Sequence, residues 1–519
     1  MKKANQLYDL IQSLTKNEKR YFKICAAKHV IGGKNNYVKL FDYIAGQKEY
    51  NEEAIKVKFK NENFIKRLSA AKYDLYHLIL KSLNEYHQGK SIKFLLRDGL
   101  NSIQVLMDKA LYSHCLKLIQ TNKALAYKFD EFQYVLEILE EERKAIRKMG
   151  SGVEMKEEIE KINEESIAIQ ERLNRIGEFV RIGAEVQKLV NQFGRPRNDE
   201  EMAQFTAIID NDAWRFPEDE LTNKEKVQCF MAKSLYYYAI REQEKSYQYS
   251  KKRVEIYEEH ADVISDHGTY LGALYNLEVT ANSIKKYDES QAVRQRIKAF
   301  AERFPDKLTV NNQVQIFKSL NNELIYYTDT VQFEKGIALV DDLYAGMEAL
   351  KGKLGRSDEI ILLYNITILY LYADKPHIAI KWLNKLLNHP SATYREDIYS
   401  FSRIINLIIH FELGNFDVLP YYVRSTYRFL EKANRKFKVE EAIVNFIRKK
   451  QPYIAEGDKV KTRAAFKELL DQILTFIEEP DEMGCLDYFN IVSWLESKVE
   501  NKSYKEVYTE RYLKEFNEC

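Results

Sequence analysis

The feature of this sequence that most constrains its fold is a pair of apolar, helix-like segments that recurs along the chain. In residues 363–390, LYNITILYLYADKPHIAIKWLNKLLNHP, two such segments are separated by a break at DKP, and small Ala379 follows three residues later. Apolar positions at helical spacing predict a helix on each side of the break, and the small side chain lets the two helices approach closely. Such a pair cannot cover its own apolar face, so we expect it to stack on neighbouring pairs.

Related copies begin at Leu235, Leu274 and Leu320, and a weaker copy surrounds Asn101. In each of the three an aromatic residue closes the turn and a small residue follows three positions later. Successive small positions are 40 to 46 residues apart. The turn aromatics are Tyr247, Tyr287 and Phe333, and the small residues are Ser250, Ser290 and Gly336.

Polar residues mark an equivalent position on the first helix of each pair. Asn276, Asn322 and Asn365 lie fourteen residues ahead of the small residue, and Tyr236 takes that place in the copy that begins at Leu235. In a stack of pairs the first helices line one face, so these four side chains are candidate contacts for a bound peptide. The alternative interpretation is that the asparagines only bridge neighbouring pairs.

Turn-forming residues are scarce, with only 19 Gly and 8 Pro among 519 residues. Sandwiches, barrels and doubly wound sheets need many sharp reversals, so this scarcity favours long helices joined by short turns. We therefore expect an all-α fold, an α-solenoid of antiparallel helix pairs preceded by a basic helical module.

The order of asparagine, aromatic and small residue, seen as YNL…Y…A, resembles the tetratricopeptide repeat over residues 221–450. The spacing of 40 to 46 residues exceeds the family's 34, so the resemblance implies lengthened repeats. It also implies that such asparagines hydrogen-bond the backbone of a bound peptide. The whole chain is similar to uncharacterised helical-repeat proteins of Bacteroidetes-type bacteria through SLTKNEKRYFK, RIINLIIHFELGNFD and FNIVSWLESK, a likeness that implies no activity.

A long helix is predicted between the amino-terminal part and the repeats. Its apolar residues form a heptad seam that ends with Ile176 and Val180, and QFGRPRND breaks it at Gly194 and Pro196. We predict one helix over residues 155–193. The predicted segments are a basic helical module (1–98), a first helical-repeat-like pair (99–150), the long helix and connector (151–220), the repeats (221–450) and terminal capping helices (451–519).

The first 98 residues carry 20 Lys and Arg against 10 Asp and Glu, whereas the whole chain has a net charge of only +2. Thr15 and Glu18 have the spacing of a capping box, which predicts a helix from Lys16. Phe22, Cys25, Ala26 and His29 form its predicted buried stripe, and the Gly32-Gly33 pair is expected to end it.

A turn at NEN, residues 61–63, divides a short helix from a longer one and permits a helix-turn-helix interpretation. A nucleic-acid-binding face would then combine this turn with the preceding basic helix, whereas the alternative is a solvated helix surface. The candidate contacts are Lys19, Arg20, Lys23, Lys34, Lys66 and Arg67.

Motifs of catalysis and metal binding are not found in the sequence. There is no C-x-x-C, H-E-x-x-H or G-x-S-x-G, and GGKNN lacks the leading Gly of a phosphate loop. We therefore expect no enzyme activity, no cofactor and no metal. Five well-separated cysteines, with no long apolar run and no apolar leader, predict reduced thiols in a cytoplasmic protein that does not cross a membrane.

The leading functional hypothesis is a non-enzymatic scaffold that binds a protein or peptide in the groove of the solenoid. Arg403 and Arg424 would add a surface for an anionic ligand. The alternative is a regulator whose basic module contacts nucleic acid while the repeats sense a partner. The sequence leaves the partner and the oligomeric state open.

Overall fold

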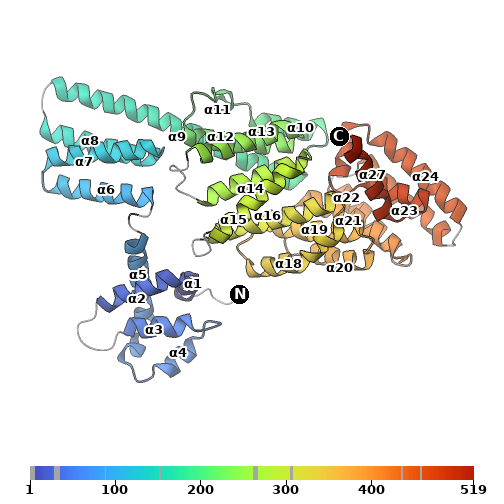
Figure 1. Ribbon diagram of the computed structural model, residues 1–519, viewed down its shortest axis with the longest axis horizontal. Coiled ribbons are helices and arrows are strands. Elements are labelled where there is room, and N and C mark those ends of the chain that lie inside the picture. Colours follow the sequence, from blue (N-terminus) through green and yellow to red (C-terminus); the bar gives the residue numbers. More distant parts are fainter. Residues whose placement is uncertain are drawn as a thin grey trace. The chain divides into compact units, whose positions relative to one another are not determined.

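The computed structural model is built from helices, and no strand occurs in residues 6–28, 36–87, 89, 91–150, 153–260, 267–303, 308–433, 437–455 and 459–518, which are those the structure describes (Figure 1). The chain divides into two compact units, Met1–Glu171 and Arg172–Cys519, and the boundary falls inside one long helix. The expected all-α fold of packed helix pairs is confirmed.

In the first unit, helix α2 begins where the capping box predicts. The Thr15 amide donates to Glu18 Oε2 at 2.8 Å, the Glu18 amide donates to Thr15 Oγ1 at 3.2 Å, and α2 starts at Lys16. Phe22, Cys25 and Ala26 are buried as predicted, whereas His29, Gly32 and Gly33 lie outside the described residues. The helices are α1 (Gln6–Ser13), α2 (Lys16–Lys28), α3 (Asn36–Ala45), α4 (Glu52–Lys58), the 3-10 helix η1 (Asn63–Arg67), α5 (Leu68–His87), α6 (Ile92–Asp108), α7 (Tyr112–Lys128), α8 (Phe132–Met149) and the start of α9 (Val153–Phe193).

The second unit continues α9 and stacks helix pairs along the chain. Its helices are α10 (Asp199–Ile208), α11 (Asp212–Arg215), α12 (Asn223–Ala239), α13 (Gln243–Glu259), α14 (His267–Ser283), α15 (Tyr287–Arg303), α16 (Val310–Asp329), α17 (Phe333–Ala338), α18 (Val340–Ala349), α19 (Arg356–Tyr372), α20 (Pro376–Leu387), α21 (Glu396–Glu412), α22 (Leu419–Lys432), α23 (Lys438–Ala455), α24 (Lys459–Phe476), α25 (Pro480–Met483), α26 (Ile491–Glu500) and α27 (Tyr504–Glu518), with 3-10 helices η3 (Ala392–Tyr394) and η4 (Gly484–Asp487).

One turn geometry joins the two helices of successive pairs. Between α19 and α20, Asp374 adopts φ 55°, its amide donates to the Leu371 carbonyl at 3.2 Å, and the Lys375 amide donates to the Tyr370 carbonyl at 2.9 Å. These two bonds define a Schellman cap, which satisfies carbonyls left open at a helix end. The same left-handed conformation recurs, with φ between 50° and 67°, at Ala110, Asp130, Arg241, Lys285, Val331, Asp374 and Gly414.

In three pairs the small residue lies five positions after the left-handed residue, whereas the same position after Gly414 holds the buried Leu419. Ser290 and Ala379 are fully buried there, and a Cβ on Gly336 would meet Leu369 Cδ1 at 3.0 Å. The tight helix approach expected from the sequence is therefore present in these pairs.

The register predicted for the α12–α13 pair is wrong by one helical turn. Its left-handed residue is Arg241, so the equivalent small residue is Ser246 and not Ser250. The residue fourteen positions earlier is Ala232, and Tyr236 lies one turn further along α12. In this copy Gln243 stands where the other copies have the turn aromatic. The sequence prediction therefore aligned the next aromatic residue, Tyr247, with the turn.

Helix α9 covers the predicted residues and ends at Phe193, directly before Gly194. Its predicted seam fails at Val180, which is 47% exposed, while neighbouring Phe179 is fully buried. Val180 lies eighteen residues, or five full turns, after buried Ile162, so a straight helix turns both side chains to the same side. The buried stripe changes because this part of α9 packs in a core of the second unit through Phe179, Ile182 and Val186. Among the described residues, no helix is both long enough and apolar enough to cross a membrane.

Candidate functional site

The connector after α9, residues 194–198, runs into the interior of the second unit. Gly194 ends α9 with φ +73°, and its amide donates to the Val190 carbonyl at 2.9 Å. A Cβ on Gly194 would lie 3.0 Å from the Cβ of Asp397 and would collide with the hydroxyl of Tyr488. Both the left-handed backbone and the close approach therefore require glycine.

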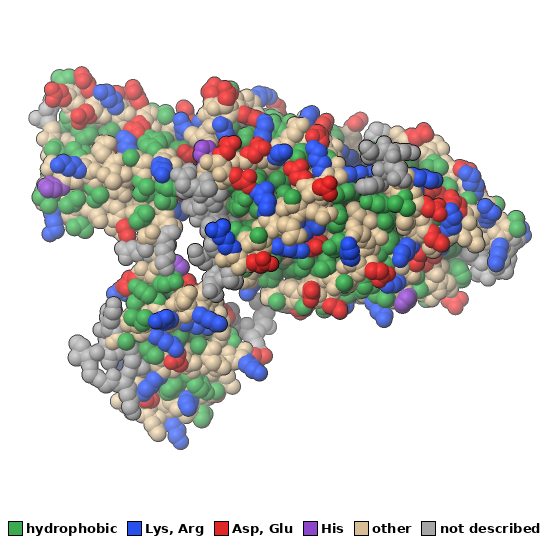
Figure 2. All heavy atoms as spheres, in the orientation of Figure 1, with side chains coloured by type: hydrophobic (Ala, Val, Ile, Leu, Met, Phe, Trp, Pro, Cys, Tyr) green, Lys and Arg blue, Asp and Glu red, His purple; other side chains and the backbone are tan. Residues whose placement is uncertain are grey.

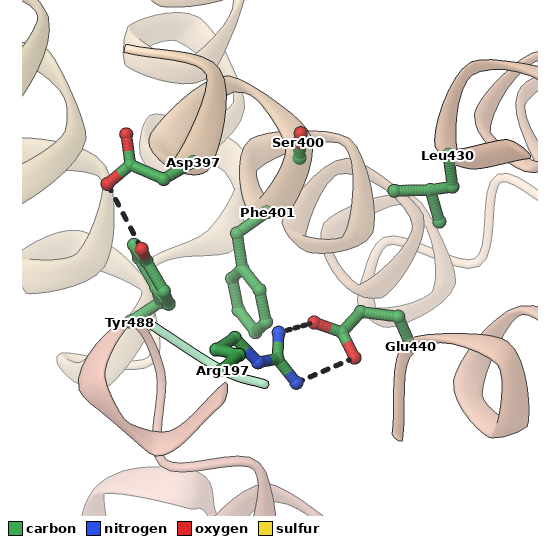
Figure 3. Close-up of a pocket in the computed structure, with 7 residues that line it drawn as sticks. All are labelled: Arg197, Asp397, Ser400, Phe401, Leu430, Glu440 and Tyr488. Atoms are coloured by element: carbon green, nitrogen blue, oxygen red, sulfur yellow. Dashed lines mark hydrogen bonds and ion pairs between the residues drawn. The ribbon is translucent and has the colours of Figure 1, made fainter. Parts of the chain in front are cut away.

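Arg197 anchors the connector (Figure 3). Its side chain is 4% exposed, and its Nη1 and Nη2 atoms lie 2.5 and 3.4 Å from the two carboxylate oxygens of Glu440. Nη2 also lies 3.6 Å from Glu482 Oε2, and the guanidinium carbon stands 3.5 Å from the centre of the Phe437 ring. Two carboxylates and an aromatic face thus surround one buried cation.

The same carboxylates mark the start of α23. Glu482 accepts the Lys438 amide at 2.8 Å through Oε1 and the Val439 amide at 3.0 Å through Oε2. Glu440 belongs to the first turn of that helix. Negative charge is favourable at a helix amino terminus, and Arg197 compensates for its burial there.

A second ion-pair cluster holds the other arginine of the connector. Asp487 accepts from Arg195 Nη1 and from Arg241 Nη2, each at 2.9 Å. Arg241 Nη1 also donates to the Pro196 carbonyl at 2.8 Å, and the Arg195 guanidinium lies 4.6 Å from the centre of the Tyr238 ring. The connector is therefore held by Arg241, in the turn between α12 and α13, and by Asp487, in the segment before α26.

Tyr488 packs against α19 and α21, which are the first helices of their pairs. Its hydroxyl donates to Asp397 Oδ2 at 3.0 Å, and its ring stacks on Phe401 with 5.2 Å between ring centres (Figure 3). Its carbonyl accepts from the Tyr364 hydroxyl at 3.0 Å. The cavity between these residues and Arg197 measures about 10 Å³, the space of a single water. We call this assembly the connector clamp: residues 194–198 with Asp397, Glu440, Glu482, Asp487 and Tyr488.

Two of the three asparagines predicted to contact a peptide bond to neighbouring pairs. Asn365 Nδ2 donates to Asn321 Oδ1 at 3.2 Å, and buried Asn322 accepts from Asn282 at 3.5 Å. Asn276 is half-buried. The contacts of Asn322 and Asn365 are the bridging arrangement that the sequence left as the alternative.

The other predicted partner contacts are dispersed. Tyr236 is buried and packs edge-on against Trp214, at 5.1 Å between ring centres. Arg403 donates to the Ser425 hydroxyl at 3.2 Å and covers the Phe429 ring, with its guanidinium carbon 4.5 Å from the ring centre. Arg424 is exposed. The structure does not bring Tyr236 and the two arginines into one site.

The predicted nucleic-acid contacts differ in their surroundings. Arg20, Lys66 and Arg67 are exposed, and none forms an ion pair with a residue that the structure describes. Lys19 is half-buried, whereas Lys23 pairs with Asp42 at 2.6 Å. Lys66 and Arg67 end η1, and the longer helix α5 begins after them at Leu68. Lys34 lies outside the described residues.

The cysteines of the described segments do not resemble reactive thiols. Cys25, Cys115, Cys229 and Cys485 are buried and unpaired with one another. Burial raises the pKa of Cys229 and of Cys485 to about 12, which disfavours a nucleophilic thiolate near neutral pH. In the part of the chain that the structure describes, His, Cys, Asp and Glu side chains form no group of three that could hold a metal ion.

No protein-family model matches the chain, and no curated protein matches it as a relative.

The residues of the connector clamp were missed at the sequence level. QFGRPRND was interpreted only as a helix break, although two arginines in so short a break are a signal that it is held by acidic partners. Their partners Glu440 and Asp487 stand 243 and 292 residues away in the sequence, beyond the reach of any local pattern.

Proposed function

We propose that this chain is a non-enzymatic scaffold that binds a protein or peptide partner on its array of helix pairs. The observation that carries the proposal is the stacking of successive helix pairs through the second unit, where α14 packs on α16, α16 on α19 and α19 on α21. Stacks of this kind expose long continuous surfaces, and their usual role is recognition. Because the connector clamp fills the face against α19 and α21, a partner binds either on the surface left open or by displacing the connector.

We also propose that the pairs are lengthened relatives of the tetratricopeptide repeat and that the protein works in the cytoplasm. The first proposal is supported by the 40-to-46-residue spacing of the left-handed residues from Arg241 to Gly414. The second is supported by buried cysteines that remain thiols, which suits a reducing compartment.

A tagged full-length chain should capture protein partners from its native cytosol, and nuclease treatment should leave them bound. Mass spectrometry of treated and untreated halves measures this. Capture that disappears with nuclease would contradict the scaffold. A parallel capture with Asn276→Ala, which breaks neither of the bridging bonds of Asn322 and Asn365, assigns the partner to the first-helix face only if binding is lost while the unfolding curve stays unchanged.

The second candidate function is a nucleic-acid-binding regulator, favoured by the exposure of Arg20, Lys66 and Arg67. Phosphate contacts release counterions, so this candidate requires retention on heparin that falls steeply with salt. It also requires that Ala at these three positions weakens retention. Retention that is equal for the triple variant and the natural chain would remove this candidate.

A further inference from the structure

An open hollow of about 720 Å³ lies over α10 and α11, and none of the residues that line it belongs to the connector clamp. Small Ala203 and Ala207, one helical turn apart on α10, leave it unfilled. Met202, 36% exposed, and Ile209 add apolar walls. A concave apolar surface of this size accepts a bulky side chain from a partner.

Trp214 forms the rigid side of the hollow. Its amide donates to Asn211 Oδ1 at 2.9 Å, which caps α11. Its ring contacts Tyr236, at 5.1 Å between ring centres, and Lys233, whose Nζ lies 5.6 Å from the ring centre. A tryptophan held in place before binding loses little side-chain entropy when a partner docks, as in the anchor residues of protein interfaces.

The surroundings of the hollow are strongly acidic (Figure 2 shows Asp and Glu side chains gathered over α11). Residues 199–220 contain eight Asp and Glu and a single basic residue, Arg215. Arg215 is already paired with Asp210 and lies 3.8 Å from Asp212. Asp199 and Asp210 line the hollow and form its acidic rim. Further exposed carboxylates of the same segment are Glu200, Asp212, Asp219 and Glu220.

We propose that this hollow docks a basic segment of a protein partner, one bulky apolar side chain entering between Met202 and Trp214 while flanking Lys and Arg side chains meet the acidic rim. Charge complementarity selects the partner, because a segment without positive charge would leave the rim uncompensated and an acidic one would be repelled. This inference rests on the proposed scaffold function and names the chemistry of its partner.

The test uses the full-length chain and a short fluorescent peptide with Lys and Arg on both sides of one Leu. Anisotropy should show binding that weakens as salt rises, since the rim charges are exposed. Replacing Leu with Ser in the peptide should weaken binding at least about tenfold. Ala207→Arg should weaken it by at least as much, because a cation would fill the hollow. Ala464→Arg, at an exposed alanine of α24, is the matched control and should change nothing.

Three outcomes would overturn the docking proposal. They are equal binding by Ala207→Arg and the natural chain, equal weakening by Ala464→Arg, and self-association of the natural chain that Ala207→Arg abolishes, which would assign the hollow to a second copy. Cytosolic partners that remain bound to Ala207→Arg would contradict the hollow and leave the scaffold standing. No captured partner at all, with the peptide still binding at the hollow, would instead contradict the scaffold.

Discussion

Arg197→Ala is expected to lower the free energy of unfolding of the second unit by about 3–5 kcal/mol, because it strands the buried carboxylates of Glu440 and Glu482 without their cation. Both side chains are 5% exposed, so water cannot take over the role of the guanidinium. Urea unfolding followed by tryptophan fluorescence measures the effect selectively. All three tryptophans, Trp214, Trp382 and Trp494, belong to the second unit.

The matched control is Arg215→Ala, which breaks an ion pair whose arginine is 64% exposed. Exposed pairs contribute at most about 1 kcal/mol, so this variant should unfold almost like the natural chain. If the two variants lose the same stability, Arg197 is not a buried anchor and the clamp described above is wrong.

Gly194→Ala should destabilise the second unit through two separate effects. A left-handed backbone costs a non-glycine residue about 1–2 kcal/mol. The added methyl group would also press on Asp397 and Tyr488, and overpacking of this kind costs about 1–3 kcal/mol more. The same fluorescence-detected urea titration gives the sum.

Gly352→Ala separates the two effects. Gly352 has φ +75°, nearly the value of Gly194, but its Cβ would meet nothing within 4 Å. It should therefore show only the backbone cost. Equal losses at Gly194 and Gly352 would mean that the connector does not pack against Asp397 and Tyr488.

Local features of the fold were predictable because they depend on neighbours in sequence. The DKP break gave the α19–α20 turn with Ala379 buried, and α9 ends where Gly194 and Pro196 were expected to break it. Thr15 and Glu18 form the capping box that their spacing indicates. In each case a few side chains close together in the sequence determine the local backbone conformation.

The sequence predictions were wrong where packing between distant segments determines which residues are buried or paired. Val180 and Phe179 lie on different sides of α9. The heptad pattern predicted that Val180 is buried, whereas Phe179 is the buried residue. Tyr236 was misplaced because Gln243 lacks the aromatic that marks the other turns. The connector clamp could not be foreseen, since its ion pairs join residues separated by hundreds of positions.

The clamp also bears on the proposed scaffold function. The connector packs against α21 through Gly194, and displacing it would expose the charges of Arg197 and Glu440. This cost favours the proposed docking site at the hollow over α10 and α11.

The most direct test of the connector clamp is a double-mutant cycle between Arg197 and Glu440. The free energies of unfolding of Arg197→Met, Glu440→Gln and the double variant are compared with that of the natural chain. If Arg197 and Glu440 form the buried pair described above, the double variant loses less stability than the two single variants together, by about 1–3 kcal/mol. Losses that simply add would show that the two residues do not interact and would contradict the clamp.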